Sequence, residues 1–344
     1  MSGDRALLAV AGDNVRTDAA IVAPDGSLLA AVRGPGASPD LLGLESSLAT
    51  LAEILEKAWL AAGVGAEQRR ATLGMYFMAG VDTPEDEQRL SQGIAARRWS
   101  LTSSVANDVF ASLWAANGKG EGVAVFVGSG INCVGRVASG TTARFLALGP
   151  LSGDWGDGES LGIAALAAAV RAEEGRGQPT CLSQRVSQYF RLPTAAKVAV
   201  AINSGQIPRA RLLELVPLVV FAAVLHDPVV DGLLDRQADE IVRYVVAASR
   251  RLGIGAQPFD VVLSGSLLAE EGAATVVRVR RRLATVLPRA RPVICKSLPV
   301  LGAALAGLAA MGVSEAAQQR LRPALVGSQV QPLSGSTFLN LPGN

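Results

Sequence analysis

Short apolar segments separated by glycine-containing turns open the chain. Residues 5–11 and 17–23 have the composition of strands, and Asp25 and Gly26 form a hairpin turn before a third apolar segment at 27–33. This spacing predicts an antiparallel meander of three strands. Gly and Pro then dominate residues 34–39, which indicates a loop.

Helical and strand periodicities alternate after this loop. Apolar residues recur every three or four positions over 40–62, which predicts an amphipathic helix. Thr83, followed by proline and three acidic residues, is a typical helix start. The remaining elements expected here are a strand at 71–78, a helix from 83 to about 98, a strand at 101–106 and a helix at 109–117.

The opening pattern is repeated in the second half of the chain. Three more strand-like segments, at 123–127, 132–138 and 141–148, form a second predicted meander. Beyond them we expect helices at 159–173, 180–190, 211–226, 229–252, 268–287 and 299–311, and strands at 259–263 and 292–296. The alternation predicts an α/β fold with mixed sheets, and the repeat suggests an internal duplication.

Composition narrows the class of protein. At 344 residues the chain is long enough for two domains, and a net charge of +2 argues against a broad nucleic-acid surface. The apolar windows at 215–225 and 300–313 are shorter than the roughly 18 residues of a membrane span. We therefore expect no nucleic acid and no membrane as partners.

The cysteines and the histidine exclude further chemistries. Cys133, Cys181 and Cys295 are odd in number and far apart, which indicates reduced thiols. His226 is the single histidine, so a His-rich zinc site and a His-based proton relay are not expected. Because the first residues do not read as a signal peptide either, the expected location is cytoplasmic.

The most informative stretch is GVAVFVGSGINCVGR, residues 122–136. A buried strand ends in Gly128, Ser129 and Gly130, and a second strand follows at once. The two glycines permit positive φ angles, and the N–H groups of such a turn can face an anion. A glycine turn between two strands differs from Rossmann and Walker loops, which lie between a strand and a helix.

Seven segments in order resemble the N-acetylglucosamine kinase and BadF-type ATPase family of the sugar kinase/actin/Hsp70 superfamily, and are most similar to its actinobacterial-type amino-sugar kinases. They are residues 6–26, 33–39, 105–115, 123–136, 148–177, 261–268 and 298–310. The resemblance implies two actin-like (ribonuclease H-like) domains with a cleft between them, a homodimer, and the use of ATP and Mg²⁺. The domains implied are 1–117, with a helix at about 299–312 packing back on it, and 118–298, followed by an irregular tail at 325–344.

The resemblance also implies a site. Asp108 matches the catalytic base, although the residue pattern alone is equally typical of a helix cap. The positions matching ATP and phosphate contacts are Gly12, Asp13, Asn14, Arg16, Thr17, Gly128, Ser129, Gly130, Ser264, Gly265 and Ser266. The positions matching sugar contacts are Gly36, Ser38, Asn107, Asp108, Asn132, Gly153 and Asp154. Asp13 and Asp157 are the candidate Mg²⁺ carboxylates.

The first phosphate loop departs from the family pattern. Ala11 occupies the position of an aspartate that normally helps to hold Mg²⁺, Asp13 replaces a glycine, and Val15 replaces a hydroxyl residue. Two functions therefore stay open. The chain phosphorylates an amino sugar such as N-acetylglucosamine or glucosamine at its 6-hydroxyl, or it is a catalytically impaired relative that binds sugar or nucleotide.

A third reading is the ATPase activator of a CoA-ester reductase or dehydratase. Such activators share the expected fold but hold an iron–sulfur cluster between paired cysteines. The three cysteines here do not supply such a pair.

Overall fold

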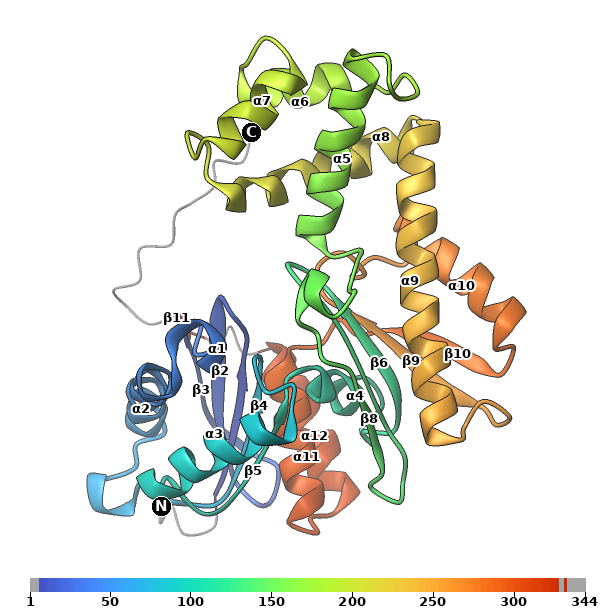
Figure 1. Ribbon diagram of the computed structural model, residues 1–344. Helices are drawn as coiled ribbons and strands as arrows, with labels where there is room; N and C mark the ends of the chain where they lie inside the picture. The colour runs from blue at the N-terminus through green and yellow to red at the C-terminus, as the bar shows by residue number, and fades with distance from the viewer. Residues whose placement is uncertain (1–5, 328–330, 333–344) are drawn as a thin grey trace. The chain divides into compact units, whose positions relative to one another are not determined.

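The computed structural model describes residues 6–327 and 331–332. The chain forms two compact units, one made of Met1–Glu121 with Cys295–Asn344 and the other of Gly122–Ile294 (Figure 1). Each unit contains one mixed β-sheet covered by helices, so the α/β class predicted from the sequence is confirmed.

The sheet of the first unit begins with the predicted meander. The strands β1 (Leu7–Gly12), β2 (Arg16–Val22) and β3 (Leu28–Pro35) pair antiparallel. Two later strands, β4 (Ala71–Met78) and β5 (Ser100–Asn107), extend the sheet in parallel with β1. The carboxyl ends of β1, β4 and β5 consequently lie at one edge, where parallel strands commonly present binding residues.

Helices cover the faces of this sheet. They are α1 (Pro39–Leu42), α2 (Leu44–Ala61), α3 (Pro84–Arg97), α4 (Val109–Asn117), α11 (Pro299–Ala310) and α12 (Glu315–Gly327), with a 3-10 turn at Ala66–Gln68. Leu8 and Val10 belong to a core shared with α2 and α3, whereas Leu7 on the alternate side of β1 packs against Gly307 of α11.

Two expectations for these helices were wrong. The single helix predicted over 40–62 is divided at Gly43, whose φ of 76° ends α1. Part of the predicted irregular tail is regular, because residues up to Gly327 belong to α12 and Gln331–Pro332 forms the short strand β11 beside β3. The remaining tail positions lie outside the described residues.

The second unit repeats the topology of the first. Its strands are β6 (Gly122–Val127), β7 (Ile131–Arg136), β8 (Thr142–Arg144), β9 (Phe259–Ser264) and β10 (Ala290–Ile294), in the order β10-β9-β6-β7-β8. As in the β5-β4-β1-β2-β3 part of the other sheet, a meander is extended by two parallel strands. The shared order supports the internal duplication. β8 ends at Arg144 and is shorter than the predicted 141–148.

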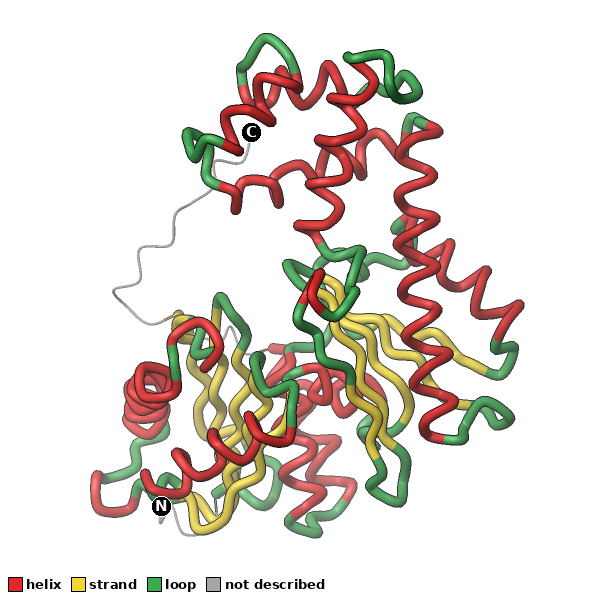
Figure 2. Tube along the Cα trace, in the orientation of Figure 1, coloured by secondary structure: helices red, strands yellow, loops and turns green. Residues whose placement is uncertain are grey.

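The helices of this unit are α5 (Gly158–Glu173), α6 (Leu182–Phe190), α7 (Ala195–Asn203), α8 (Val216–Val224), α9 (Pro228–Leu252) and α10 (Ala274–Val286), with 3-10 turns at Gly149–Leu151 and Arg209–Leu215. Figure 2 shows α5–α8 grouped beyond the end of the sheet, where they share a separate core. The sequence did not predict α7, and α10 begins six residues later than expected.

The basic run at 278–282 has a structural role. Arg282 of α10 lies 2.6 Å from Asp239 and 2.8 Å from Asp235 on α9, and Arg278 pairs with Asp231 and Asp235. These ion pairs join two helices along their length. Within the described residues no single helix is long and apolar enough to cross a membrane; one sharply bent pair, 209–224 with 228–252, meets the length and composition criteria only jointly.

Candidate active site

The first unit collects polar residues at the carboxyl edge of its parallel strands. The Ala79 N–H donates to the Gly12 carbonyl (2.8 Å), and the Asp108 N–H donates to the Met78 carbonyl (3.2 Å). These two bonds fasten the loops after β1, β4 and β5 to one another. Asp13, Asp82 and Asp108 are therefore carried by adjacent loops of one edge.

Asp108 stands at the start of α4 but its side chain makes no capping hydrogen bond. The N–H of Val109 donates to Oδ1 of Asn107 instead (2.9 Å), and Nδ2 of Asn107 donates to Asp82 (2.8 Å). The amide oxygen of Asn107 thus accepts the first N–H of α4, and the Asp108 carboxylate is not committed to a capping hydrogen bond.

The surroundings of Asp108 alter its acidity. Burial of the carboxyl group and then the nearby charges of Asp82 and Asp13 raise its pKa to about 7. A carboxylate with a pKa near the working pH is well matched to accepting a proton in a transition state. The sequence analysis missed Asp82, although an acidic residue in the loop after a buried strand was a usable signal.

Asp13 organises the first loop. Its Oδ1 accepts the N–H groups of Val15 (2.7 Å) and Arg16 (2.8 Å), and its Oδ2 lies 3.7 Å from the Arg16 guanidinium. Gly36, from the loop expected to cover a sugar, donates its N–H to the Val15 carbonyl (3.0 Å). A Cβ at Gly36 would stand 2.4 Å from the Asn14 carbonyl oxygen, so this close approach requires glycine.

Four other positions of this region are buried. Ser38 donates from Oγ to the Ala79 carbonyl (3.3 Å). Thr17 is fully buried and its hydroxyl has no hydrogen-bond partner in the part of the chain described, so the expected contact with a phosphate is not open to it in this conformation. Ala11 faces Asp18 across β1 and β2, but Asp18 is held by Arg33 at 2.6 and 2.8 Å and does not replace the missing aspartate.

In the second unit the two predicted nucleotide loops are neighbours. β6 and β9 are parallel and end side by side, at the 128–130 turn and the 264–266 loop. Gly265 has a φ of 92°, and a Cβ there would lie 2.3 Å from the Val127 carbonyl oxygen. The Gly128 carbonyl accepts the N–H of Gly158 (2.8 Å) at the start of α5, while Ser129 and Gly130 remain exposed.

Other predicted positions here have structural bonds of their own. Ser264 is buried and donates to the Val125 carbonyl (3.3 Å). Asp157 caps α5, since its oxygens accept the N–H (2.8 Å) and the hydroxyl (2.7 Å) of Ser160. A negative charge at a helix N-terminus is favourable, which explains an acidic residue beside this loop.

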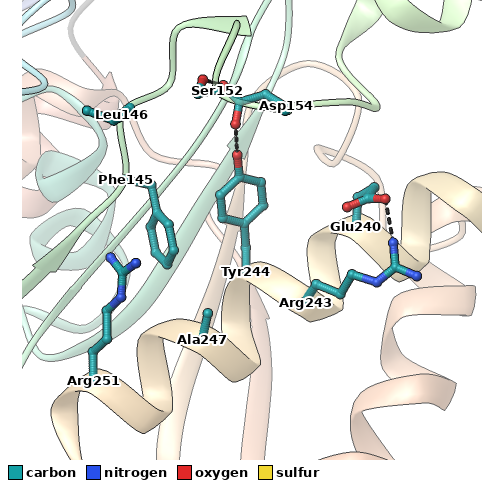
Figure 3. Close-up of a pocket in the computed structure, with 10 residues that line it drawn as sticks. Phe145, Leu146, Ser152, Asp154, Glu240, Arg243, Tyr244, Ala247 and Arg251 are labelled. Atoms are coloured by element: carbon teal, nitrogen blue, oxygen red, sulfur yellow. Dashed lines mark hydrogen bonds and ion pairs between the residues drawn. The ribbon is translucent and has the colours of Figure 1, made fainter. Parts of the chain in front are cut away.

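Asn132 and Asp154 are both nearly buried, at 9% and 7% exposure. Asn132 lies opposite Phe126 in the β6–β7 pair, and its Oδ1 accepts the N–H of Cys133 (2.7 Å). Asp154 follows Gly153 in a turn and accepts hydrogen bonds from Ser152 and from Tyr244 of α9 (Figure 3). Tyr244 was not predicted, because nothing in a mid-helix tyrosine marks it.

Metal ligation has limited support from the side chains. In the described ranges no three His, Cys, Asp or Glu side chains gather closely enough to hold a metal ion by themselves. Mg²⁺ in phosphoryl-transfer sites often uses only one or two carboxylates together with the phosphates. Asp13 fits such a role through Oδ2, whereas both oxygens of Asp157 already support α5.

The chain is similar in sequence to several known proteins. A model of the BadF/BadG/BcrA/BcrD ATPase family matches residues 15–307. The N-acetylmuramic acid/N-acetylglucosamine kinase of Clostridium acetobutylicum is 26% identical over 190 residues. The matched residues are 55% of this chain and 62% of that kinase, so the chain spans less than two thirds of its length. The N-acetyl-D-glucosamine kinase of Dictyostelium discoideum is 24% identical over 251 residues, 70% of this chain and 77% of that kinase.

The fold also matches a solved structure. A Chromobacterium violaceum protein assigned as an N-acetylglucosamine kinase superposes with a TM-score of 0.67 at 24% identity, over 89% of this chain and 99% of that one. At this identity the likeness establishes the shared fold, which is the two-domain actin-like architecture predicted from the sequence.

Proposed function

This chain belongs to the BadF/BadG/BcrA/BcrD ATPase family, and on that premise we propose that it transfers the γ-phosphoryl group of ATP to the 6-hydroxyl of an amino sugar, N-acetylglucosamine or glucosamine. The observation that carries the proposal is Asp108, which lies at the carboxyl edge of parallel strands. Its carboxylate makes no capping hydrogen bond to α4 and has a pKa raised to about 7. The names of the relatives supply the substrate class.

The proposed reaction needs one proton acceptor. The sugar hydroxyl oxygen bonds to the γ-phosphorus, the bond from that phosphorus to the bridging oxygen of ADP breaks, and the hydroxyl proton passes to Asp108. Such a transfer depends mainly on positioning and charge neutralisation. The remaining residues of the site accordingly act as binding groups.

Both units supply groups suited to phosphate and sugar. In the second unit, the exposed Ser129–Gly130 peptide beside the N-terminus of α5 offers N–H groups to an anion. In the first unit Arg16, 44% exposed, offers a positive charge. Asn132 and Asp154 are the proposed partners of sugar hydroxyls, because an oriented acceptor that loses its hydroxyl partner is costly and so discriminates between sugars.

Mg²⁺ is the proposed cofactor, and bound with ATP it would neutralise phosphate charge. Asp13 is the residue of this chain proposed to face it. The charges of Asp82 and Asp13 raise the pKa of Asp108, so a cation bound at this edge together with ATP would relieve their repulsion.

Replacing Asp13 with Asn tests the role of its charge. The amide oxygen keeps an acceptor for the N–H groups of Val15 and Arg16, so the loop geometry should persist. We expect the Mg²⁺ concentration for half-maximal ADP release to rise about tenfold, as one unit of charge near the metal is lost. An unchanged Mg²⁺ requirement, with normal turnover, would assign Asp13 to loop geometry alone.

The direct test of the function is sugar-dependent ADP release. Purified protein is incubated with ATP and Mg²⁺ and a panel containing N-acetylglucosamine, glucosamine, N-acetylmuramic acid, N-acetylmannosamine and glucose. We expect the highest kcat/KM with N-acetylglucosamine or glucosamine and a 6-phosphate product by NMR. Absence of ADP release with every sugar would contradict the kinase proposal.

Ala11 motivates a second candidate, a sugar- or nucleotide-binding relative with impaired turnover. That candidate predicts thermal stabilisation by ligand without ADP release, and a large gain of activity in Ala11→Asp. Efficient turnover by the natural chain eliminates it. We further propose that the enzyme is located in the cytoplasm, where ATP is supplied. We also propose that it is a homodimer, which light scattering of the purified protein tests.

A further inference from the structure

A pocket of about 410 Å³ in the second unit contains more than the two residues expected from the sequence. It lies between the segment 145–154 and α9 (Figure 3). Phe145, Gly153 and Asp154 of the segment and Tyr244 and Arg251 of α9 are among its lining residues. The carboxylate of Asp154, which we propose binds the sugar, therefore lies in a pocket that is also lined by the aromatic rings of Phe145 and Tyr244.

Asp154 is held from two directions. The Ser152 hydroxyl donates to Oδ2 (2.5 Å), and the Tyr244 hydroxyl donates to Oδ1. A carboxylate offers about four acceptor positions, so each oxygen retains one for another donor. The carboxylate is thus fixed in direction and still able to accept hydrogen bonds from a ligand.

Tyr244 is itself rigidly placed. Its ring meets that of Phe145 edge-on, with centroids 5.0 Å apart and planes at 90°. Burial, and then the hydrogen bond to Asp154, raise the pKa of the Tyr244 hydroxyl, so that it stays protonated and can donate at neutral pH. Its position on the long helix α9 anchors this donor to the sheet core.

The backbone of the turn is held by hydrogen bonds of its own, because the N–H groups of Gly153 and Asp154 donate to the carbonyls of Pro150 (3.2 Å) and Gly149 (3.0 Å). Gly153 has a φ of 82°, and a Cβ there would meet no atom within 4 Å. The turn fixes the backbone of Asp154, and the hydrogen bonds from Ser152 and Tyr244 fix the direction of its carboxylate.

We propose that Tyr244 is a positioning residue for the sugar: through its hydroxyl it orients Asp154 so that the free lone pairs of the carboxylate meet the ring hydroxyls. The inference rests on the proposed function. Tyr244 touches neither ATP nor the attacking hydroxyl in this role, so it acts on the sugar KM and leaves the ATP KM unchanged.

Tyr244→Phe tests the inference, with ADP release measured against both substrates. We expect the sugar KM to rise about tenfold, since hydrogen bonds to charged groups are among the stronger ones, with the ATP KM within twofold of the natural protein. Tyr189→Phe is the matched control, because Tyr189 also donates to a carboxylate, Glu214 (3.0 Å), but at an exposed site. It should leave both constants unchanged.

A double substitution separates positioning from general loss of structure. In an Asp154→Asn background Tyr244→Phe should cause no further rise in sugar KM, because the group that Tyr244 orients has already changed. An equal, additive rise in both backgrounds, or an unchanged sugar KM in Tyr244→Phe alone, overturns the inference.

Failure of the proposed function has a different signature. If the natural protein releases no ADP, the kinase proposal falls, and calorimetric binding of the same sugars replaces KM as the readout for Tyr244. If it also binds none of the sugars, the inference falls with it.

Discussion

Asp108→Asn is expected to lower sugar-dependent ADP release by about 10²- to 10⁴-fold, the usual contribution of a positioned general base. Asparagine keeps the size of the side chain but cannot accept the proton of the attacking hydroxyl. The loss should appear in kcat, with the sugar KM changed far less. A decrease below tenfold would mean that Asp108 is not the base.

The pH dependence of the natural protein gives a second readout for Asp108. The base must be deprotonated, so kcat/KM should fall as the pH drops below about 7 and level off above it. Asp82→Asn tests this assignment, because it removes a charge that raises the pKa of Asp108. The fall in kcat/KM should then occur at lower pH. If the pH at which kcat/KM falls is unchanged in Asp82→Asn, a group other than Asp108 causes the fall.

The same pKa has a consequence for stability. The pKa of Asp108 in the folded protein lies above its ordinary value of 3.8, so the unfolded chain releases this proton first and stability falls as the pH rises from about 4 to 7. Asp108→Asn lacks this penalty. Its stability advantage over the natural protein should therefore grow across that range, which urea unfolding at several pH values measures.

Gly302→Ala should destabilise the first unit by about 3 kcal/mol or abolish its folding, at the high end for overpacking. A Cβ at Gly302 would stand 1.9 Å from the carbonyl oxygen of Ala111 and 2.7 Å from its carbonyl carbon. Both atoms are backbone, so no side-chain rotation relieves the clash. To admit the methyl group α11 must move away from α4, the helix that begins after Asp108.

Gly232→Ala is the matched control for this helix-to-helix contact. Gly232 also lies inside a helix, α9, but a Cβ there meets nothing within 4 Å. The usual helix preference of alanine should then stabilise the protein by about 0.5 to 1 kcal/mol. Thermal unfolding of both variants checks the pair, and a neutral Gly302→Ala would show that α4 and α11 are not closely packed.

Periodicity and turn chemistry predicted most of the fold. The strand at 71–78 and the helix at 109–117 were placed to the residue, because strong apolar patterns end at clear turn or cap residues there. Helix α7 was missed, since it is short and its apolar face is completed only by the neighbouring helices of its cluster. Likewise, α12 contains Pro323, which argues against a helix from sequence alone.

The site was only partly readable. Asp13 and Asp108 were predicted from the resemblance to the family, and the structure places both after parallel strands of one sheet. The burial of Thr17 and the contact of Tyr244 with Asp154 were not, since they depend on strand register and on a side chain ninety residues further along the chain. Which of the sites touches ATP or sugar stays a prediction.

Two neighbouring residues have separate roles at the start of α4: Asn107 accepts a helix N–H, and Asp108 is the proposed base. Because the amide oxygen of Asn107 accepts the N–H of Val109, we expect that the carboxylate of Asp108 can be replaced without loosening the start of α4. The Asp108→Asn protein should consequently behave as a substrate trap, folded and able to hold ATP and an amino sugar side by side without consuming them. A crystal structure of that complex would show both ligands before the reaction.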